Sequence, residues 1–574
     1  MMGICKLVDE LNRLRKSSSE SIDGIGSFDD FKKYMHVSRK AEEDLIEILR
    51  KVALSGKKTL VLLCGSAGDG KSHLLSYLKN DLHLLENYTV YNDATESSAP
   101  SKTAIETLYE ALVDFSDENI ENPGNNFILA INLGVLSNFI ESEYGASFRK
   151  LYQHVVSSNI LTNKINEGGY IENSPFQHVS FSDYHMYSLT KDGIHPVYLE
   201  AILSRIFNKE EKNPFFTVYK NECQICPLSE KCPVKHNFEF LTKNENREFI
   251  ANSLVEVIVK DKEILTTREI LNYVYDIVVA PSFNYKKMAQ ASTNTVSFLK
   301  EYVRDITPTL MYEYTDMSVL MNQLKKYDPL LERSEEADEA AIFYYVSSDV
   351  RKEITDTFGK ESYGEILCKN TAIAKINDDK TLKAQIFSAL VRINAMRNRM
   401  SVGAAYSSFL RNLYYYNIGK TRKLGELYNL VEAAITQWCG STPDGNICFD
   451  EIHEGITLYE KIDFEPYLED LPNQNASEEL QRFLPFVTVK YENKKTGEIV
   501  VLDIDYSLYE MIYRLEKGYI QTADDRNNHA DFISFIEKIL KTGSSEKELT
   551  VITDDNKKAV IEKTKFGYKF KVVK

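Results

Sequence analysis

The sequence lacks any apolar run near the roughly 18 residues that a membrane-spanning helix requires. Its first residues, MMGICKLVDELNRLRKSSSES, also lack the apolar core of a secretory signal peptide. Cysteine is scarce, with eight in 574 residues, which is too few for a disulfide-based scaffold and is typical of a reducing compartment. These absences predict a cytoplasmic protein with no membrane contact.

Positive charge is also in short supply, since 69 Lys and Arg face 85 Asp and Glu for a formal net charge of −16. This argues against a protein coated by nucleic acid, although a local basic groove or a DNA-binding partner stays compatible with it. The chain lacks the G-x-S-x-G and H-E-x-x-H motifs, an internal repeat, and a nuclease-like set of carboxylates with a lysine. Its chemistry must therefore lie in other motifs.

One short stretch carries the strongest signal. Residues 65–72, GSAGDGKS, fit the pattern G-x-x-x-x-G-K-[ST] of a phosphate-binding loop. The apolar run TLVLLC at 59–64 comes before it and predicts a strand buried on both faces. The next residues, KSHLLSYLKN, predict a helix with an apolar face. A strand, this loop and a helix in that order indicate a nucleoside triphosphatase.

The loop assigns roles to its residues. In such loops, backbone N–H groups converge on the phosphates at the positive end of a helix. We expect Lys71 to reach the β- and γ-phosphates and Ser72 to coordinate Mg²⁺, with ATP as the nucleotide. His73 is expected to support the loop by packing rather than to act as a base. The expected binding residues are Gly65, Ser66, Ala67, Gly68, Asp69, Gly70, Lys71, Ser72 and His73.

Hydrolysis also needs an acid that faces the metal and a group that orients water. Asp93 and Glu96, in VYNDATES at the end of a strand expected over 88–93, are candidates for these two roles. The chain between Lys71 and Asp93 is too short for an intervening strand, and NDATES could instead cap the next helix. Asp183, in SFSDYH, is the reserve candidate.

Two further residues are candidate nucleotide contacts. Asn132 ends the apolar run FILAIN, where AAA+ ATPases place a sensor for the γ-phosphate. Arg268, in TTREILNYVYD, begins an amphipathic helix and resembles the lid arginine of the same ATPases. A strand-end turn residue and a surface arginine are the structural alternatives.

The rest of the chain predicts an α/β P-loop NTPase core that is AAA+-like and has a parallel sheet. Strands expected at 88–93, 127–132 and 176–183 alternate with helices, as such a sheet requires. One of these helices is expected at 101–115, where Ser101 could cap its N-terminus. A helical lid, a Cys-rich metal knuckle and a mainly helical C-terminal half follow. The C-terminal FVTVKYENKKTGEIVVLDIDY predicts a hairpin, with a further β element after it. The expected parts are an N-terminal helical segment (1–55), the core (56–200), the knuckle segment (201–260), the lid (261–345), a helical domain (346–470) and an α+β region (480–574).

The knuckle segment contains ECQICPLSEKCPVKHN, in which Cys223, Cys226, Cys232 and His236 supply four N or S donors. These match a closed, structural Zn²⁺ site, although an iron–sulfur cluster with a fourth ligand elsewhere is an alternative. The other cysteines, Cys5 included, show no ligand spacing and are expected to be core or incidental residues. Tyrosines among basic residues in RNLYYYNIGKTRK could contact nucleic acid but fit a helix core better.

The order of these motifs resembles a known family. GSAGDGKSHLLSYL, NDATES with KTAIETL, AINLGVLSNFI, VSFSDYHMYSLT, the cysteine cluster, TTREILNYVYDI and DYSLYEMIYRLEKGYIQTADDR follow one another as in the DptF family, over residues 28 to 540. DptF proteins are the ATPase-type components of bacterial restriction systems that depend on DNA phosphorothioation. The resemblance implies ATP-dependent DNA restriction in anti-phage defence beside DptG- and DptH-like subunits, with DNA contacted directly or through them.

Three other functions stay open from the sequence. A STAND-type signalling switch would hold and exchange ATP, but it usually carries a repeat region that this chain lacks. A non-catalytic scaffold would bind nucleotide only to stabilise its fold. A replication helicase or loader is the third.

Overall fold

The computed structural model describes residues 5–20, 28–66, 68–92, 103–162, 168–331, 335–347, 349–398, 403–442, 445–452, 455–463, 465–472, 478–493, 495–555 and 557–573. The chain forms two compact units, one of Met1–Ser188 with His195–Met400 and one of Leu189–Ile194 with Ser401–Lys574. The boundary after Met400 falls inside the segment 346–470 that was expected to be one domain.

The first unit contains a four-stranded parallel sheet in the order β2-β3-β1-β4. Its strands match the four apolar runs in the sequence, which confirms the expected parallel α/β arrangement. β1 is central and buried at all five positions, as a continuous Leu, Val and Cys run requires. The strands are β1 (Leu60–Cys64), β2 (Tyr88–Tyr91), β3 (Asn126–Ile131) and β4 (Phe176–Ser180).

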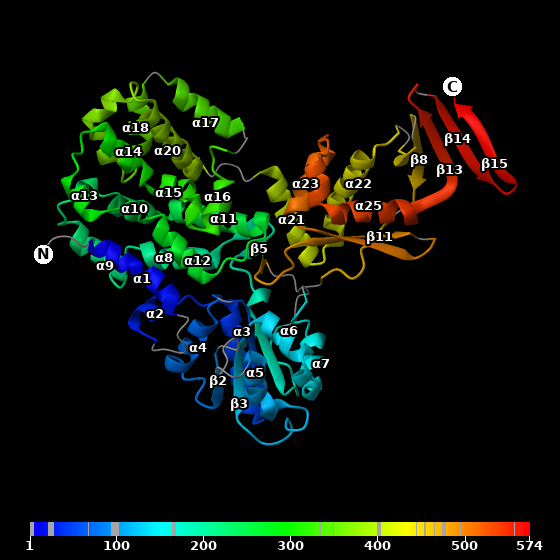
Figure 1. The fold of residues 1–574 in the computed structure, drawn as a ribbon, viewed down its shortest axis with the longest axis horizontal. Helices are drawn as coiled ribbons and strands as arrows, with labels where there is room; N and C mark the ends of the chain where they lie inside the picture. The colour runs from blue at the N-terminus through cyan, green and yellow to red at the C-terminus, as the bar shows by residue number, and fades with distance from the viewer. Residues whose placement is uncertain are drawn as a thin grey trace. The chain divides into compact units, whose positions relative to one another are not determined.

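Helices cover both faces of this sheet (Figure 1). Because side chains alternate along a strand, Val61 and Leu63 pack on one face with α3 and α4, whereas Leu60 and Leu62 pack on the other with α5, α6 and α7. A capping box of Thr103 and Glu106 begins α5, so Thr103 takes the position expected for Ser101, which lies outside the described residues. These helices are α3 (Lys40–Ser55), α4 (Lys71–Asn80), α5 (Ala104–Leu112), α6 (Leu133–Glu141) and α7 (Arg149–Ser157).

The rest of the first unit is helical, as expected. α1 packs against α9 and α12, so this first helix of the N-terminal segment is part of the helical region, whereas α3 of the same segment covers the sheet. The helices are α1 (Lys6–Glu20), α2 (Asp30–Met35), α8 (Val197–Phe207), α9 (Pro214–Val218), α10 (Pro233–Leu241), α11 (Asn244–Asp261), α12 (Thr267–Asp276), α13 (Tyr285–Gln290), α14 (Val296–Arg304), α15 (Thr307–Glu313), α16 (Val319–Lys325), α17 (Glu335–Val346), α18 (Val350–Phe358), α19 (Gly364–Lys369) and α20 (Lys380–Asn398).

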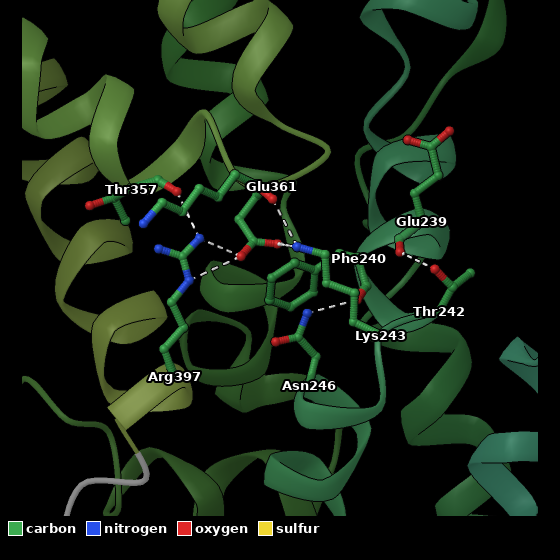
Figure 2. Close-up of polar contacts among 9 residues, drawn as sticks. Glu239, Phe240, Thr242, Lys243, Asn246, Thr357, Glu361 and Arg397 are labelled. Atoms are coloured by element: carbon green, nitrogen blue, oxygen red, sulfur yellow. Dashed lines mark hydrogen bonds and ion pairs between the residues drawn. The ribbon is translucent and has the colours of Figure 1, made fainter.

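A buried carboxylate joins three parts of this helical region (Figure 2). Glu361, between α18 and α19, accepts from Lys243 Nζ at 2.9 Å and from Arg397 Nε at 3.1 Å. Arg397 on α20 also donates to the carbonyl oxygen of Thr357 at 2.8 Å. The Glu361 side chain is only 3% exposed, so its charge depends on these two cations.

A second ion pair is buried more deeply. Arg392 on α20 donates from Nε to Asp328 Oδ1 at 3.1 Å and from Nη2 to Asp328 Oδ2 at 2.6 Å. The two side chains are 1% and 0% exposed. Burial alone would raise the pKa of Asp328, but the hydrogen bonds and charge of Arg392 outweigh it and lower that pKa.

We expect Arg392→Met to lower the free energy of unfolding by about 3–5 kcal/mol, because it removes the bidentate partner of the buried Asp328 carboxylate and leaves only Lys325, at 2.9 Å, to balance that charge. The folded pKa of Asp328 lies below its unfolded value of about 3.9, so the stabilisation is present above that pH and is lost as the pH falls through the folded pKa. Urea unfolding at neutral pH and at low pH measures both effects. The control is Lys380→Met, an exposed cation on the same helix. An equal loss of stability in both variants would contradict the prediction.

The second unit combines helices with three sheets, in the orders β15-β14-β13-β8-β7, β12-β11-β9 and β10-β5-β6. The expected hairpin is confirmed by β11 and β12, which pair antiparallel from Val487–Ile504 to Asn493–Glu498. The elements are β5 (Ser188–Thr190), β6 (Gly193–His195), α21 (Ala404–Asn417), α22 (Gly425–Cys439), β7 (Ile447–Ile452), β8 (Ile456–Ile462), β9 (Glu465–Pro466), β10 (Glu479–Leu480), β11 (Val487–Asn493), β12 (Glu498–Ile504), α23 (Tyr506–Glu516), α24 (Ala523–Asn528), α25 (Ala530–Gly543), β13 (Ser544–Thr553), β14 (Lys558–Thr564) and β15 (Gly567–Val573).

The tyrosine-rich stretch lies on α21. Tyr414 and Tyr416 are buried, at 7% and 4% exposure, which favours the core interpretation over stacking on nucleic acid bases. Across the described part of the chain, no helix combines the length and the apolar character needed to cross a membrane.

Candidate functional site

The loop Gly65–Gly70 leaves the buried end of β1 and leads directly into α4. Gly68 and Gly70 have φ angles of +89° and +95°, in the left-handed region that glycine adopts without strain. Gly65 has a different requirement, because an added Cβ would lie 2.7 Å from Asp69 Oδ2. The loop therefore closes tightly over the N-terminus of α4.

Lys71 is held inside this loop. Its Nζ donates to the carbonyl oxygens of Gly65 at 2.9 Å and Ser66 at 2.6 Å, and lies 3.4 Å from Asn132 Oδ1. The ammonium thus stays at the carboxyl edge of the sheet, within the loop that the sequence singled out. Ser72 follows as the second residue of α4 and is partly buried.

Asp69 supports the loop from within. Its Oδ2 accepts from the Ser66 N–H. Burial raises the pKa of the Asp69 carboxyl, and the nearby Lys71 only partly offsets this. Arg39, which precedes α3, adds a second cation because its guanidinium contacts the carbonyl oxygens of Asp69 at 3.5 Å and Tyr184 at 3.1 Å.

The strands beside β1 bring two candidate residues to the same edge. Cys64 is in register with Ile131 on β3 and with Ser180 on β4. Asn132 therefore follows β3 next to Gly65, whose N–H donates to the Ile131 carbonyl at 3.2 Å. Asp183 ends the short turn after β4 and lies near enough to raise the pKa of Cys64, although burial is the larger cause. Three other predicted residues, Ala67, Asp93 and Glu96, lie outside the described part of the chain.

The N-terminus of α12 touches the loop. A Cβ added at Gly68 would lie 3.1 Å from the Thr266 Cβ, so the Thr266 side chain lies close to the Gly68 backbone. Thr266 and Glu269 form a capping box that defines the first turn of α12. Arg268 lies in that same turn and is partly buried, so it is on the part of α12 nearest to the loop.

His73 packs at the first turn of α4, and its Nε2 lies 3.1 Å from His36 Nδ1. Its ring stacks on His36 with centroids 5.3 Å apart, and Phe28 lies at the same centroid distance. Burial lowers the pKa of His73 to about 4, with a smaller contribution from His36. The ring is therefore neutral at physiological pH and supports the first turn of α4.

The cysteine cluster lies elsewhere in the first unit. Cys223, Cys226 and Cys232 line a small cavity together with Cys5, which directly precedes α1. His236 lies one turn further along α10, where its Nδ1 is 2.6 Å from the Tyr302 hydroxyl. The fourth side chain that the structure brings to the three thiols is thus Cys5, which the sequence had suggested was core or incidental.

Three residues at the phosphate-loop site and the cysteine cluster were not predicted from the sequence: Arg39, Cys5 and Thr266. Arg39 and Cys5 come from segments far along the chain from the motifs they contact, so no local spacing could reveal them. Thr266 did carry a signal, because T-x-x-E before an apolar periodic segment is a capping box and marks where α12 begins.

Comparisons with protein-family models, with curated proteins and with solved structures find no match to this chain.

Proposed function

We propose that this chain is a P-loop ATPase of AAA+-like organisation that binds ATP with Mg²⁺ at the loop Gly65–Gly70 and hydrolyses it. The observation that carries the proposal is the position of Lys71, held by loop carbonyls at the carboxyl edge of a parallel sheet and 3.4 Å from Asn132. Open α/β sheets bind ligands at this edge. A loop with two glycines in the left-handed region, followed by a helix N-terminus, suits phosphate oxygens.

Each residue then has a definable task. Lys71 exchanges the carbonyl oxygens of Gly65 and Ser66 for phosphate oxygens, while the backbone N–H groups of the loop and of the first turn of α4 hold the phosphates. Ser72 coordinates Mg²⁺. Asn132, next to the ammonium, positions the group that attacks the γ-phosphate or reports its presence.

The acids are assigned as the motifs suggest. Asp93 would be a further ligand of Mg²⁺ and Glu96 would orient water, with Asp183, in the short turn after β4, as the reserve for the metal-facing role. Arg268 contacts the γ-phosphate from α12, whose first turn lies against Gly68. This contact would let the helical region respond to the state of the nucleotide.

We further propose that ATP turnover serves a multi-protein, phosphorothioation-dependent DNA restriction complex with DptG- and DptH-like subunits. What supports this role is the order of the motifs, which resembles that of the DptF family over residues 28 to 540. The sequence offers no nuclease motif, so cleavage belongs to a partner. The net charge of −16 suits a subunit that leaves much of the DNA contact to others.

Steady-state ATP turnover tests this role. The purified chain, alone and with DptG- and DptH-like partners, is assayed without DNA, with unmodified duplex and with phosphorothioated duplex. We expect turnover to rise with DNA and to differ between the two duplexes. If the rate of turnover in the presence of the partners does not change when DNA is added, the restriction role is contradicted but the ATPase activity still stands. If the chain holds nucleotide tightly and shows no turnover, the result favours a scaffold.

A further inference from the structure

Four cysteines from two distant parts of the chain meet at one cavity. Cys5 precedes α1, whereas Cys223, Cys226 and Cys232 belong to the segment between α9 and α10. The cavity has a volume of about 20 Å³. All four are free cysteines and none forms a disulfide.

We propose that Cys5, Cys223, Cys226 and Cys232 bind one Zn²⁺ in a closed, structural site. Four thiolates with no position left open are the ligand set of structural zinc. Thiolates also bind iron–sulfur clusters, so the metal and sulfide content of the protein must separate the two.

The other lining residues suit such a site. Lys235 lies at the cavity wall, where its ammonium offsets the net negative charge of four thiolates around one Zn²⁺. The Tyr285 hydroxyl lies 3.9 Å from Cys226 Sγ and can donate to that sulfur. Leu228 covers part of the cavity and is buried. A cation and a hydroxyl donor are surroundings that stabilise thiolate ligands, whereas the apolar wall limits the access of water to the site.

Metal binding requires the four side chains to adjust their positions. Among the described residues, no three Cys, His, Asp or Glu side chains are already arranged to hold a metal ion. The four cysteines line the same cavity, and binding one ion requires their side chains to rotate toward a common centre. His236 would stay with Tyr302, at 2.6 Å, and take no part.

The consequence is a cross-link between the N-terminal helix and the cysteine segment. α1 already contacts this segment through the ion pair of Lys6 with Glu222, at 2.7 Å. On its other side, α1 packs against α12, where Arg15 pairs with Asp276 and stacks on Tyr275 at 4.3 Å. Zinc bound by Cys5 would therefore fix α1 in place as a support for α12.

X-ray absorption at the zinc edge and metal analysis of the purified full chain test the ligand set directly. We expect one zinc per chain with four sulfur ligands at about 2.3 Å. Three sulfurs and one nitrogen would return His236 to the site and overturn the proposal. Iron with inorganic sulfide would overturn it in favour of a cluster, and a chain without any metal would overturn it entirely.

Two further measurements isolate Cys5. Cys5→Ser should lose most of its zinc on dialysis against a chelator that leaves the metal in the unchanged chain. Its matched control, Cys368→Ser, should keep its zinc, because Cys368 Sγ contacts the Ile354 carbonyl at 3.7 Å instead of the cavity. Differential alkylation of the unchanged chain does not depend on how the variant folds. Cys5 should become reactive together with the other three thiols when a chelator removes the zinc. If the alkylation of Cys5 is the same with and without the chelator, its assignment as a zinc ligand is overturned.

Discussion

Lys71→Ala is expected to reduce ATP turnover by about 10²–10³-fold. The ammonium of Lys71 lies in the loop beside Asn132, so it can neutralise charge that develops on the transferred phosphoryl group. Removing one preorganised electrostatic partner of a transition state typically costs this much in kcat. Steady-state turnover and binding of a fluorescent ATP analogue measure the loss, and we expect both to fall.

The matched control is Lys79→Ala. Lys79 lies on the same helix, in its last turn, and is exposed. Its removal changes the charge of the chain equally but should leave turnover within about twofold, because exposed charges outside a site interact weakly. An equal loss in both variants, or none in Lys71→Ala, would contradict the assignment of the loop as the phosphate site.

Much of the fold around this loop follows from local sequence patterns. β1 and β3 are continuous apolar runs, and such runs next to glycine or asparagine indicate strands buried on both faces. The hairpin of β11 and β12 follows from strict alternation, since every second side chain of β11 is buried. In these segments, the burial pattern and the local propensity agree.

Other strands could not be predicted in this way. β7, ICFDEI, and β8, ITLYEKI, mix charged and apolar residues, and β8 is mostly half-buried. β7 pairs with β8, and β8 also pairs with β13, which begins at Ser544 after three further helices. Pairing over this distance depends on tertiary contacts that no short window of sequence records.

The two candidate sites show the same contrast. The candidate phosphate loop is a local motif, so Lys71 could be identified from it, and Asn132 could be identified as the polar residue that ends the next apolar strand, β3. Cys5 and Arg39 join their sites only through folding. The spacing of the motif had suggested His236 as the fourth ligand, whereas the cavity is lined by Cys5 and His236 lies beside Tyr302. Spacing predicts ligands within one segment but carries no information about a donor on another element.

Arg268→Ala is expected to reduce kcat for ATP by about 10- to 100-fold, with a smaller change in KM. Arg268 lies in the first turn of α12, and Thr266 at the start of that turn touches Gly68. A hydrogen bond from a charged group contributes about 1.5–3 kcal/mol, which corresponds to this range of rates when the contact forms in the transition state. A loss mainly in kcat would distinguish this contact from one that only binds the nucleotide.

Arg268→Lys and Arg351→Ala complete the test. Lysine keeps the charge but lacks the planar fork of guanidinium, so we expect Arg268→Lys to recover only part of the rate. Arg351 is an exposed arginine on α18, and its removal should leave kcat unchanged. If Arg268→Ala has the same kcat and KM as the unchanged chain while Lys71→Ala is inactive, Arg268 takes no part in hydrolysis. The contact of α12 with Gly68 would then only support the loop, and communication between nucleotide and helical region would have to pass through another residue, such as Arg39.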